Sequence, residues 1–282
     1  MQSYRLFCVD RQNGYSLYHG KGIYVDGENN KYMHYDSSLT LTFFVSCKGK
    51  IKIEGNSYEI KDGDIVIMNT QQVHRLSVED RSLYERYSIY LSEDIFAAFP
   101  FESKQLFDVF YKTGANLIPQ KAVSQNGLDK IIEQIFSLAA TQDNTSKILV
   151  TCRIAELLAA LNNAVVPISE TEQYVSENPT VKKVLHYINE HFKEDISLEG
   201  IAEKFYLSKY RLEHIFKESV GVSLWEYVII RRLIYVNILI KEKVGISEAA
   251  YEAGFCNYSN FYRLYKKHMN MTPQQYKKQI SK

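Results

Sequence analysis

The sequence predicts an α+β protein, in which an N-terminal β-barrel or jelly roll with a helical hairpin precedes an all-α domain with tandem helix-turn-helix motifs. Short β-rich segments separated by Gly-containing turns fill the first ninety residues. Apolar residues at helical spacing begin after residue 95. One helical pattern then occurs twice in the last hundred residues. A chain of 282 residues is long enough for two such domains.

The N-terminal segments have the length and composition of strands. Two polar turns separate them: Gly55-Asn56 is a two-residue hairpin pair, and Lys61–Asp64 precedes an apolar run. Several short strands with Gly turns are typical of a barrel or a double-sheet jelly roll. The predicted strands are Leu39–Val45, Lys50–Glu54, Ser57–Ile60, Ile65–Met68, Val73–Val78 and Arg86–Leu91.

Two amphipathic helices are predicted next. Apolar residues recur at helical spacing within residues 128–139, and a second set lies within residues 148–161. We expect Thr145 or Ser146 to cap the second helix. The short polar loop between the two indicates a helical hairpin. Two roles for it stay open, because it can cover the barrel or form the interface of a homodimer.

A polar segment bounded by prolines, Pro167–Pro179, follows the hairpin, and we place a linker there. The charge changes across it. Residues 181–282 hold 17 Lys and Arg against 11 Asp and Glu, a net +6, whereas residues 1–180 carry a net −5. This asymmetry favours a basic nucleic-acid module joined to an acidic domain. The predicted domains are residues 1–95 for the barrel, 96–166 for the hairpin, 167–179 for the linker and 180–282 for the helical domain.

The repeat in the last hundred residues predicts two helix-turn-helix motifs. Ile201-Ala202 opens the first copy and Ala249-Ala250 the second, 48 residues apart. Phe216-Lys217 then matches Tyr265-Lys266, now 49 residues apart. In each copy a short helix, a tight turn and a second helix follow one another. Two copies are too few for a solenoid, which needs about three stacked units.

Capping signals place the helix ends. Ser223 and Glu226 form a capping box that begins an apolar-rich helix running to about Lys243. Twenty residues at a rise of 1.5 Å span about 30 Å, which is close to one turn of DNA at about 34 Å. Gly221 and Asn270 lie just past the second helix of each copy, and both residue types tolerate the left-handed conformation that ends a helix.

The second helix of each copy, which we call the reading helix, has an apolar and a polar face. The apolar residues, expected to face the core, are Leu212, Ile215 and Phe216 in the first copy and Phe261, Leu264 and Tyr265 in the second. A solvated surface is the alternative interpretation of the polar face, and the tandem repeat favours DNA contact instead. The predicted DNA-binding residues are Tyr210, Arg211, Glu213, His214, Lys217, Tyr258, Ser259, Tyr262, Arg263 and Lys266.

Side-chain chemistry suggests a role for each kind of residue. Arg263 suits guanine, because both arms of its guanidinium can reach O6 and N7. Glu213 would accept from a cytosine amine, but it would repel phosphates. Lys217 and Lys266 lie toward the helix ends and are expected to contact phosphates and fix the register. His214 is expected to donate to a base or a phosphate, and the tyrosines offer apolar faces to thymine methyl groups.

A string of positions in the C-terminal domain carries a family resemblance: Ile201-Ala202-Glu203, Leu207-Ser208, Phe216-Lys217, Gly221, Arg232-Leu233, Ile246–Ala250, Gly254-Phe255, Phe261, Arg263, Tyr265-Lys266-Lys267 and Met271–Tyr276. Over about residues 181–279 the chain resembles the AraC/XylS family of bacterial transcription regulators. The resemblance implies binding to duplex DNA in two adjacent major grooves, a homodimer and a contact with RNA polymerase. Val236, Tyr265, Asn270 and Lys277 depart conservatively from the family pattern, which leaves the fine sequence preference undefined.

The N-terminal domain is similar to the cupin-type sensor often attached to that module, through His34-Tyr35-Asp36, Gly49, Gly63-Asp64, His74-Arg75 and Tyr84–Tyr87. Metal-binding cupins use a His-x-His-x3-Glu pattern and a later His. The corresponding residues are His34, Asp36, Thr40 and His74, so two ligand positions are replaced and we expect neither a metal nor another cofactor. His34, Asp36 and His74 are the candidate ligand-binding residues. The resemblance implies a small-molecule effector, a sugar or a related metabolite.

Composition and motifs narrow the classes of function and the cellular compartments that remain. The four cysteines have no CxxC spacing, which favours a reducing cytosol. We find no signal peptide and no run of 18 apolar residues, so a cytoplasmic protein without a membrane span is expected. Phosphate-binding Gly loops, nucleophile elbows and HExxH motifs are missing from the sequence, so we expect no enzyme. The leading hypothesis is a ligand-responsive transcription regulator, activator or repressor. The alternatives are a DNA-binding protein whose N-terminal domain only dimerises, and a cupin enzyme tethered to DNA.

Overall fold

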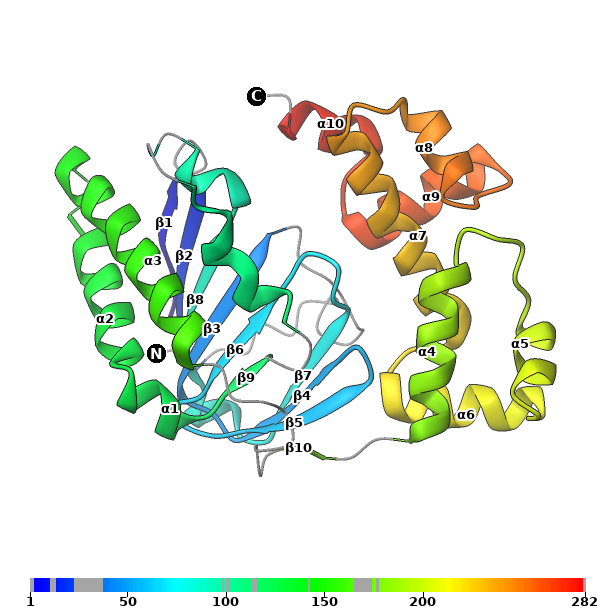
Figure 1. The fold of residues 1–282 in the computed structure, drawn as a ribbon, viewed down its shortest axis with the longest axis horizontal. Helices are drawn as coiled ribbons and strands as arrows, with labels where there is room; N and C mark the ends of the chain where they lie inside the picture. The colour runs from blue at the N-terminus through cyan, green and yellow to red at the C-terminus, as the bar shows by residue number, and fades with distance from the viewer. Residues whose placement is uncertain are drawn as a thin grey trace. The chain divides into compact units, whose positions relative to one another are not determined.

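The computed structural model describes residues 3–10, 14–22, 38–97, 99, 102–112, 116–141, 143–164, 174–175 and 178–280. The chain forms two compact units, which are described separately (Figure 1). The first, made of most residues up to Ser176, contains antiparallel sheets and a helical hairpin, and the second, from Glu177 onward, is helical. This arrangement confirms the predicted α+β fold class. Within the described ranges, no helix has both the length and the apolar character needed to cross a membrane.

Two antiparallel sheets make up most of the first unit. Their described strands follow in spatial order. The larger sheet consists of β1 (Ser3–Asp10), β2 (Tyr15–Lys21), β8 (Glu85–Leu91), β3 (Leu39–Ser46), β6 (Ile65–Met68) and β9 (Leu117–Ile118). The smaller sheet consists of β10 (Tyr174–Val175), β5 (Asn56–Ile60), β4 (Gly49–Ile53) and β7 (His74–Val78).

The strands predicted from residue 39 onward are confirmed, with ends that differ by no more than one residue. The predicted hairpin pair is wrong by one position. Glu54 and Gly55 have positive φ angles of 48° and 74°, so these two residues make the turn and Asn56 begins β5. No individual strand was predicted before residue 39, whereas β1 and β2 pair there, with an irregularity between Leu6 and Cys8.

Alternation along β3 gives the two faces of the larger sheet different neighbours. Leu39, Leu41 and Phe43 belong to a core shared with the helical hairpin. Phe44 belongs to a second core, in which the larger sheet packs on the smaller one. Thr40 and Thr42, on the same face as Phe44, are buried as well. The interior between the sheets is therefore partly polar.

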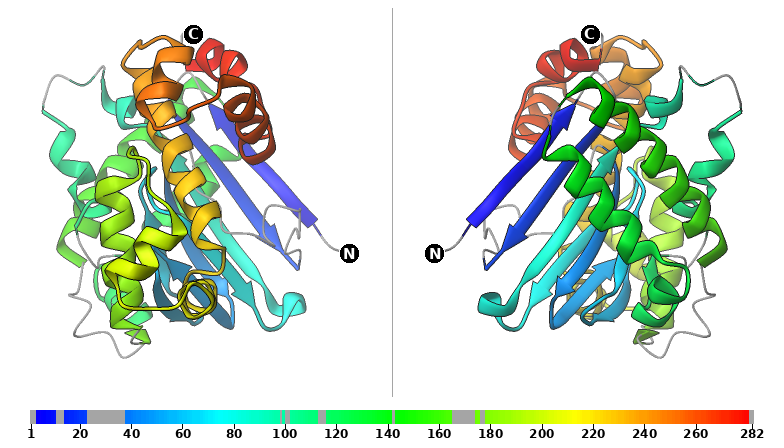
Figure 2. Two further views of the ribbon diagram at one scale, coloured as in Figure 1. Left: turned by 90° about the vertical axis from the view of Figure 1, so that its right-hand side faces the viewer. Right: turned by 90° about the vertical axis from the view of Figure 1, so that its left-hand side faces the viewer.

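The hairpin covers one face of the larger sheet (Figure 2). It consists of α2 (Leu128–Ala139) and α3 (Asn144–Ala164), and the short helix α1 (Gln120–Gln125) precedes it. Each fully buried Ile or Leu on α2 and α3 stabilises this packing by about 1.5–3 kcal/mol. The predicted cap of the second helix is wrong. Asp143 Oδ1 accepts from the Ser146 amide at 2.8 Å, which places Thr145 and Ser146 inside the first turn.

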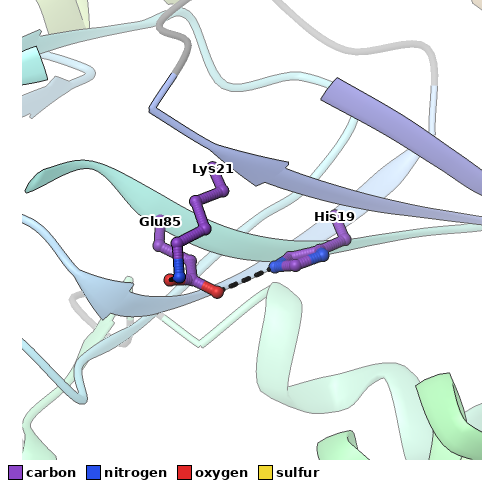
Figure 3. Close-up of polar contacts among 3 residues, drawn as sticks. All are labelled: His19, Lys21 and Glu85. Atoms are coloured by element: carbon purple, nitrogen blue, oxygen red, sulfur yellow. Dashed lines mark hydrogen bonds and ion pairs between the residues drawn. The ribbon is translucent and has the colours of Figure 1, made fainter. Parts of the chain in front are cut away.

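A polar cluster of His19, Lys21 and Glu85 links β2 to β8 (Figure 3). His19 Nε2 lies 3.0 Å from Glu85 Oε1, and Lys21 Nζ lies 2.9 Å from Glu85 Oε2. The His19 ring stacks on Tyr87 at 4.4 Å, and Tyr87 packs on Phe136 of α2 at the same centroid distance. Burial opposes ionisation of Glu85, but the hydrogen bonds from Lys21 and His19 outweigh it and lower its pKa.

The second unit contains the predicted helices. They are α4 (Pro179–His191), α5 (Leu198–Lys204), α6 (Lys209–Val220), α7 (Leu224–Lys241), α8 (Ile246–Glu252), α9 (Tyr258–Met269) and α10 (Pro273–Ile280). The 18-residue helix α7 spans about 27 Å at 1.5 Å per residue and connects the two motifs (Figure 1). Ser223 Oγ accepts from the Glu226 amide at 3.2 Å, which confirms the predicted N-cap. The helix ends two residues before the predicted end.

Candidate nucleic-acid interface

The two helix-turn-helix copies have matching dimensions. α5 and α8 each contain 7 residues, and α6 and α9 each contain 12. The turn between the helices is one residue longer in the second copy, which explains why the sequence offset changes from 48 to 49. The reading helices are therefore equivalent elements of equal length, as the repeat predicts.

The two reading helices also begin and end alike. Ser208 Oγ accepts from the Arg211 amide at 3.2 Å, and Asn257 Oδ1 accepts from the Asn260 amide at 2.9 Å. A short polar side chain thus caps each N-terminus. At the other ends, the residues after the helices, Gly221 and Asn270, have φ angles of 92° and 52°. The predicted left-handed helix ends are confirmed at both positions.

The apolar face of each reading helix is buried in its own motif, as predicted. Phe216 and Phe261 are fully covered, and truncating such a ring to Ala costs about 3–5 kcal/mol. Tyr265 is buried too, and its hydroxyl donates to Asn237 Oδ1 of α7 at 2.5 Å. Burial raises the pKa of Tyr265, so the phenol keeps the proton that it donates. This packing fixes which side of each helix faces outward.

The outward face of α6 presents four of the predicted DNA-binding residues to solvent. Tyr210, Arg211, His214 and Lys217 are exposed, and Glu213 is half-buried. The Tyr210 ring stacks on the His214 ring with centroids 6.2 Å apart and planes 6° apart. His214 Nε2 also lies 4.0 Å from Glu218 Oε2. The aromatic residues of this face are therefore held as a pair rather than singly.

The outward face of α9 is less uniform. Ser259, Arg263 and Lys266 are exposed, whereas Tyr258 and Tyr262 are half-buried and pack against the core of the second motif. The Tyr258 hydroxyl accepts from Gln274 Nε2 of α10 at 3.4 Å. The two tyrosines thus pack on the core with part of each ring and expose the rest. The helix therefore offers less exposed aromatic surface than the sequence suggested.

Sequence reasoning did not identify Asn260 as a functional residue. Its Oδ1 accepts from Nη2 of Arg263 at 2.9 Å, one turn along the same helix. This contact orients the guanidinium before any DNA arrives. The i, i+3 spacing of the two residues is the sequence signal that could have indicated the pair.

Lys209 has a partner within its own motif. Its ammonium pairs with Glu199 of α5, and the hydrogen bond from Lys209 lowers the pKa of Glu199. Lys209 is not among the predicted DNA-binding residues, and this pairing holds its charge within the motif. The last turn of α9, in contrast, carries the positive charges of Lys266 and Lys267, which favour phosphate contact there.

The candidate effector residues are only partly covered by the described structure. His34 and Asp36 lie outside the described residues. His74 on β7 is 4% exposed, and its Nδ1 lies 3.3 Å from the Gln72 carbonyl oxygen. It shares its face of the sheet with Leu76, which belongs to the core between the sheets. In the described part of the chain, no group of three or more His, Cys, Asp or Glu side chains is arranged to hold a metal ion.

Solved structures provide one set of comparisons. The C-terminal domain of AraT, a response regulator from Geobacillus stearothermophilus, is 27% identical, with a TM-score of 0.36 over 37% of this chain and 88% of that one. ToxT from Vibrio cholerae O395 is 16% identical, with a TM-score of 0.40 over 95% of this chain and 97% of its own.

Curated protein sequences provide a second set of comparisons. An uncharacterized HTH-type transcriptional regulator of Staphylococcus aureus strain COL is 25% identical over 248 residues, which is 86% of this chain and 31% of that protein. The uncharacterized HTH-type transcriptional regulator YdiP of Escherichia coli K12 is 28% identical over 108 residues, 38% of this chain and 36% of its own. The chain thus spans about a third of the length of these relatives.

Family models match both parts of the chain. A model described as an AraC-like ligand binding domain matches residues 22–158, and one described as a helix-turn-helix domain matches residues 201–279. The order is that of a sensor followed by a DNA-binding module, and it agrees with the two units of the structure. The chain therefore belongs to the AraC/XylS family of helix-turn-helix transcriptional regulators, with an AraC-like ligand-binding domain ahead of the DNA-binding domain.

Proposed function

We propose that the protein regulates transcription by inserting α6 and α9 into two adjacent major grooves of a promoter. The equivalence of the two reading helices carries this proposal. They match in length, in the chemistry of their N-caps and in the left-handed residues that end them, and each buries its apolar face. A solvated surface would not require such matched geometry. The polar outward faces, with Lys217 and Lys266 at equivalent positions, suit base edges and phosphates.

Binding of full-length protein to duplex DNA tests the proposal. Sites of about 30 base pairs would first be selected by the protein from a random-sequence pool, because two half-sites one turn apart need about this length. Fluorescence anisotropy at several salt concentrations should then give a log–log slope of about −0.9 for each neutralised phosphate. A footprint should show two protected major grooves about 10 base pairs apart for each protomer. A slope near zero, or a pool that stays random, would count against the function.

A small-molecule effector is the second part of the proposal. Thr40, Thr42 and Ser88 place hydroxyl groups on the inward face of the larger sheet, and Thr42 Oγ1 lies 3.3 Å from Ser88 Oγ. Buried hydroxyl groups on this face suit a sugar or a related polar metabolite, and His74 is a further buried polar group, on β7 of the smaller sheet. His34 and Asp36, which lie outside the described residues, also stay candidate ligand-binding residues.

Thermal unfolding against a panel of sugars and sugar acids tests the effector, because a ligand that binds the folded state raises the melting temperature. An N-terminal domain that only dimerises predicts no shift with any compound in a broad panel. A cupin enzyme tethered to DNA predicts stoichiometric bound metal and turnover of a compound that shifts the melting temperature. Metal analysis of the purified protein separates that alternative from a regulator.

We further propose that the protein acts in the cytoplasm as a homodimer formed through α3 and contacts RNA polymerase when bound to DNA. Ile148, Leu149 and Cys152 are exposed on α3 and together form an apolar strip. Exposed apolar surface of this kind is typical of a protein–protein contact. Most soluble oligomers are two-fold dimers. Sedimentation of the full chain at micromolar concentration tests the dimer directly.

A further inference from the structure

Arg232 of α7 joins the loop that precedes the first helix-turn-helix motif to the turn of the second motif. It is 8% exposed. Its Nε donates to the Phe192 carbonyl at 2.7 Å and its Nη2 to the Glu194 carbonyl at 2.8 Å, both in the loop that leads from α4 into the first motif. Its Nη1 donates to the Gly254 carbonyl at 2.7 Å, in the turn of the second motif. One planar guanidinium therefore links the loop before the first motif with the turn of the second.

The backbones of the same two segments touch next to Arg232. Gly254 has a φ of 88°, and a Cβ at this position would lie 2.5 Å from the Lys193 carbonyl oxygen. The equivalent residue of the first motif is Tyr206, which adopts a φ of 56° with its side chain in solvent. A left-handed backbone alone therefore does not demand glycine in this turn. The close approach of Lys193 does.

A third contact joins the same three segments. Lys193 Nζ lies 3.7 Å from the ring centroid of Tyr235 on α7, within the range of a cation–π interaction. The Tyr235 hydroxyl donates to Glu252 Oε1 of α8 at 2.9 Å. The loop after α4, the connecting helix and the second motif are thus held together at one place.

We propose that Arg232 is a positioning residue that fixes the placement of α9 relative to α6, and thereby the half-site spacing that the protein accepts. A connecting helix sets the separation of two motifs, but packed helices still shift by about 1–2 Å between arrangements. A shift of one base pair moves a half-site by about 3.4 Å and turns it by about 34°. The fork of Arg232, with three directed donors, suppresses such motion in a way that a lysine ammonium does not. This inference rests on the proposed function.

Arg232→Lys is the main test variant, because it keeps the positive charge and removes the fork. Full-length protein is titrated onto the selected duplex and onto versions with one base pair added or removed between the half-sites. A duplex with a single half-site is included. The wild type should prefer its selected spacing by about tenfold or more. Arg232→Lys should reduce that preference several-fold and leave single half-site affinity nearly unchanged.

Arg231→Lys, the same substitution at the neighbouring position of α7, is the matched control and should keep the wild-type spacing preference. Circular dichroism establishes that each variant is folded. If Arg232→Lys does not fold, a Tyr235→Phe, Glu252→Gln double variant replaces it, and it should relax the spacing preference in the same direction. Equal loss of affinity at all spacings, or an unchanged preference in a folded variant, would overturn the positioning role. Failure of the wild type to select any duplex would instead overturn the proposed function.

Discussion

Tyr206 occupies a backbone conformation that costs an L-amino acid about 1–2 kcal/mol. Its side chain is 96% exposed, so little packing offsets the cost. Tyr206→Gly should therefore raise the free energy of unfolding by about 0.5–1 kcal/mol, after allowing for the greater freedom of glycine in the unfolded chain. The change is measured by urea unfolding followed through Trp225, the single tryptophan, which lies in the same unit.

The reverse change at the equivalent residue is the control for Tyr206→Gly. Gly254→Ala should destabilise the unit, because its new methyl group meets the Lys193 carbonyl. A loss of stability in Tyr206→Gly would mean that the tyrosine makes stabilising contacts in the folded state, contrary to its exposure.

Arg263 and Asn260 should act on specificity together. Arg263→Ala should relax preference at one base pair by about 1–3 kcal/mol. Asn260→Ala should weaken the same preference less, because the guanidinium loses its anchor but keeps its donors. Lys266→Ala, one turn further on, should weaken binding to all sequences alike and flatten the salt slope by about one unit. A binding series over single-base variants of the site separates these outcomes, and uniform weakening by Arg263→Ala would contradict its base-reading role.

The sequence predicted the orientation of the reading helices well but their side-chain contacts poorly. The 3.6-residue period is a local property, so the buried positions of α6 and α9 follow from the order of the residues alone. The pair of Lys209 with Glu199 joins two helices, and the bonds of Arg232 join residues 22 to 40 positions apart. Such contacts depend on tertiary packing, which no spacing rule contains.

At the scale of elements, the strands that were predicted are those with turn residues on both sides. Gly and Asp turns bound the segments from β3 to β6, and the pattern located them to within one residue. β1 and β2 were not predicted. β2 pairs with β8, about 70 residues away in the sequence, so its place in the sheet depends on a non-local partner. The α3 cap was misplaced because Asp143, Thr145 and Ser146 are all capable caps, and the contact that decides among them is Asp143 with Ser146.

The stability of the pairing between β2 and β8 should depend on pH through the ionisation of Glu85. Its folded-state pKa lies below its unfolded value near 4.3. The carboxylate therefore stabilises the fold above that value, and the stabilisation is lost as the pH falls through the folded-state pKa. Glu85→Gln should cost about 0.5–1 kcal/mol at pH 7, as expected for a partly exposed ion pair. The cost should shrink as the pH falls below about 4.3 and should vanish below the folded-state pKa, where the carboxyl group is protonated and as neutral as the glutamine that replaces it.

Hydrogen exchange of peptides from β2 and β8 measures this effect directly in the intact protein. Glu79→Gln is the matched control, because Glu79 pairs with Lys48 at 3.2 Å on an exposed surface and should contribute little at any pH. An equal response of the two variants, or a Glu85→Gln cost that does not change with pH, would show that the ionised carboxylate is not what stabilises this strand pair.

At the scale of the whole molecule, function depends on how many reading helices meet the DNA at once. One protomer supplies two, and a homodimer supplies four. Linking binding modules makes the later contacts intramolecular, and the effective concentration reaches the millimolar range for short flexible linkers. Residues 1–180 carry a net negative charge, so only the basic C-terminal domain is attracted to phosphates.

A charge on the exposed strip of α3 should separate dimerisation from DNA recognition. Ile148 is 65% exposed, so Ile148→Glu should leave the stability of the protomer within about 0.5 kcal/mol of the wild type. If α3 forms the dimer, two such charges would face each other there, and sedimentation should show monomers at micromolar concentration. Affinity for DNA that carries two protomer sites should then fall at least about tenfold, whereas affinity for DNA that carries one such site should stay unchanged. Leu83→Glu is the control, since Leu83 is 64% exposed in the 3₁₀ helix Arg81–Leu83, away from α3 in the sequence. If both variants sediment like the wild type, the dimer does not form through α3. If both become monomeric, any added surface charge is sufficient, and the strip on α3 has no special role.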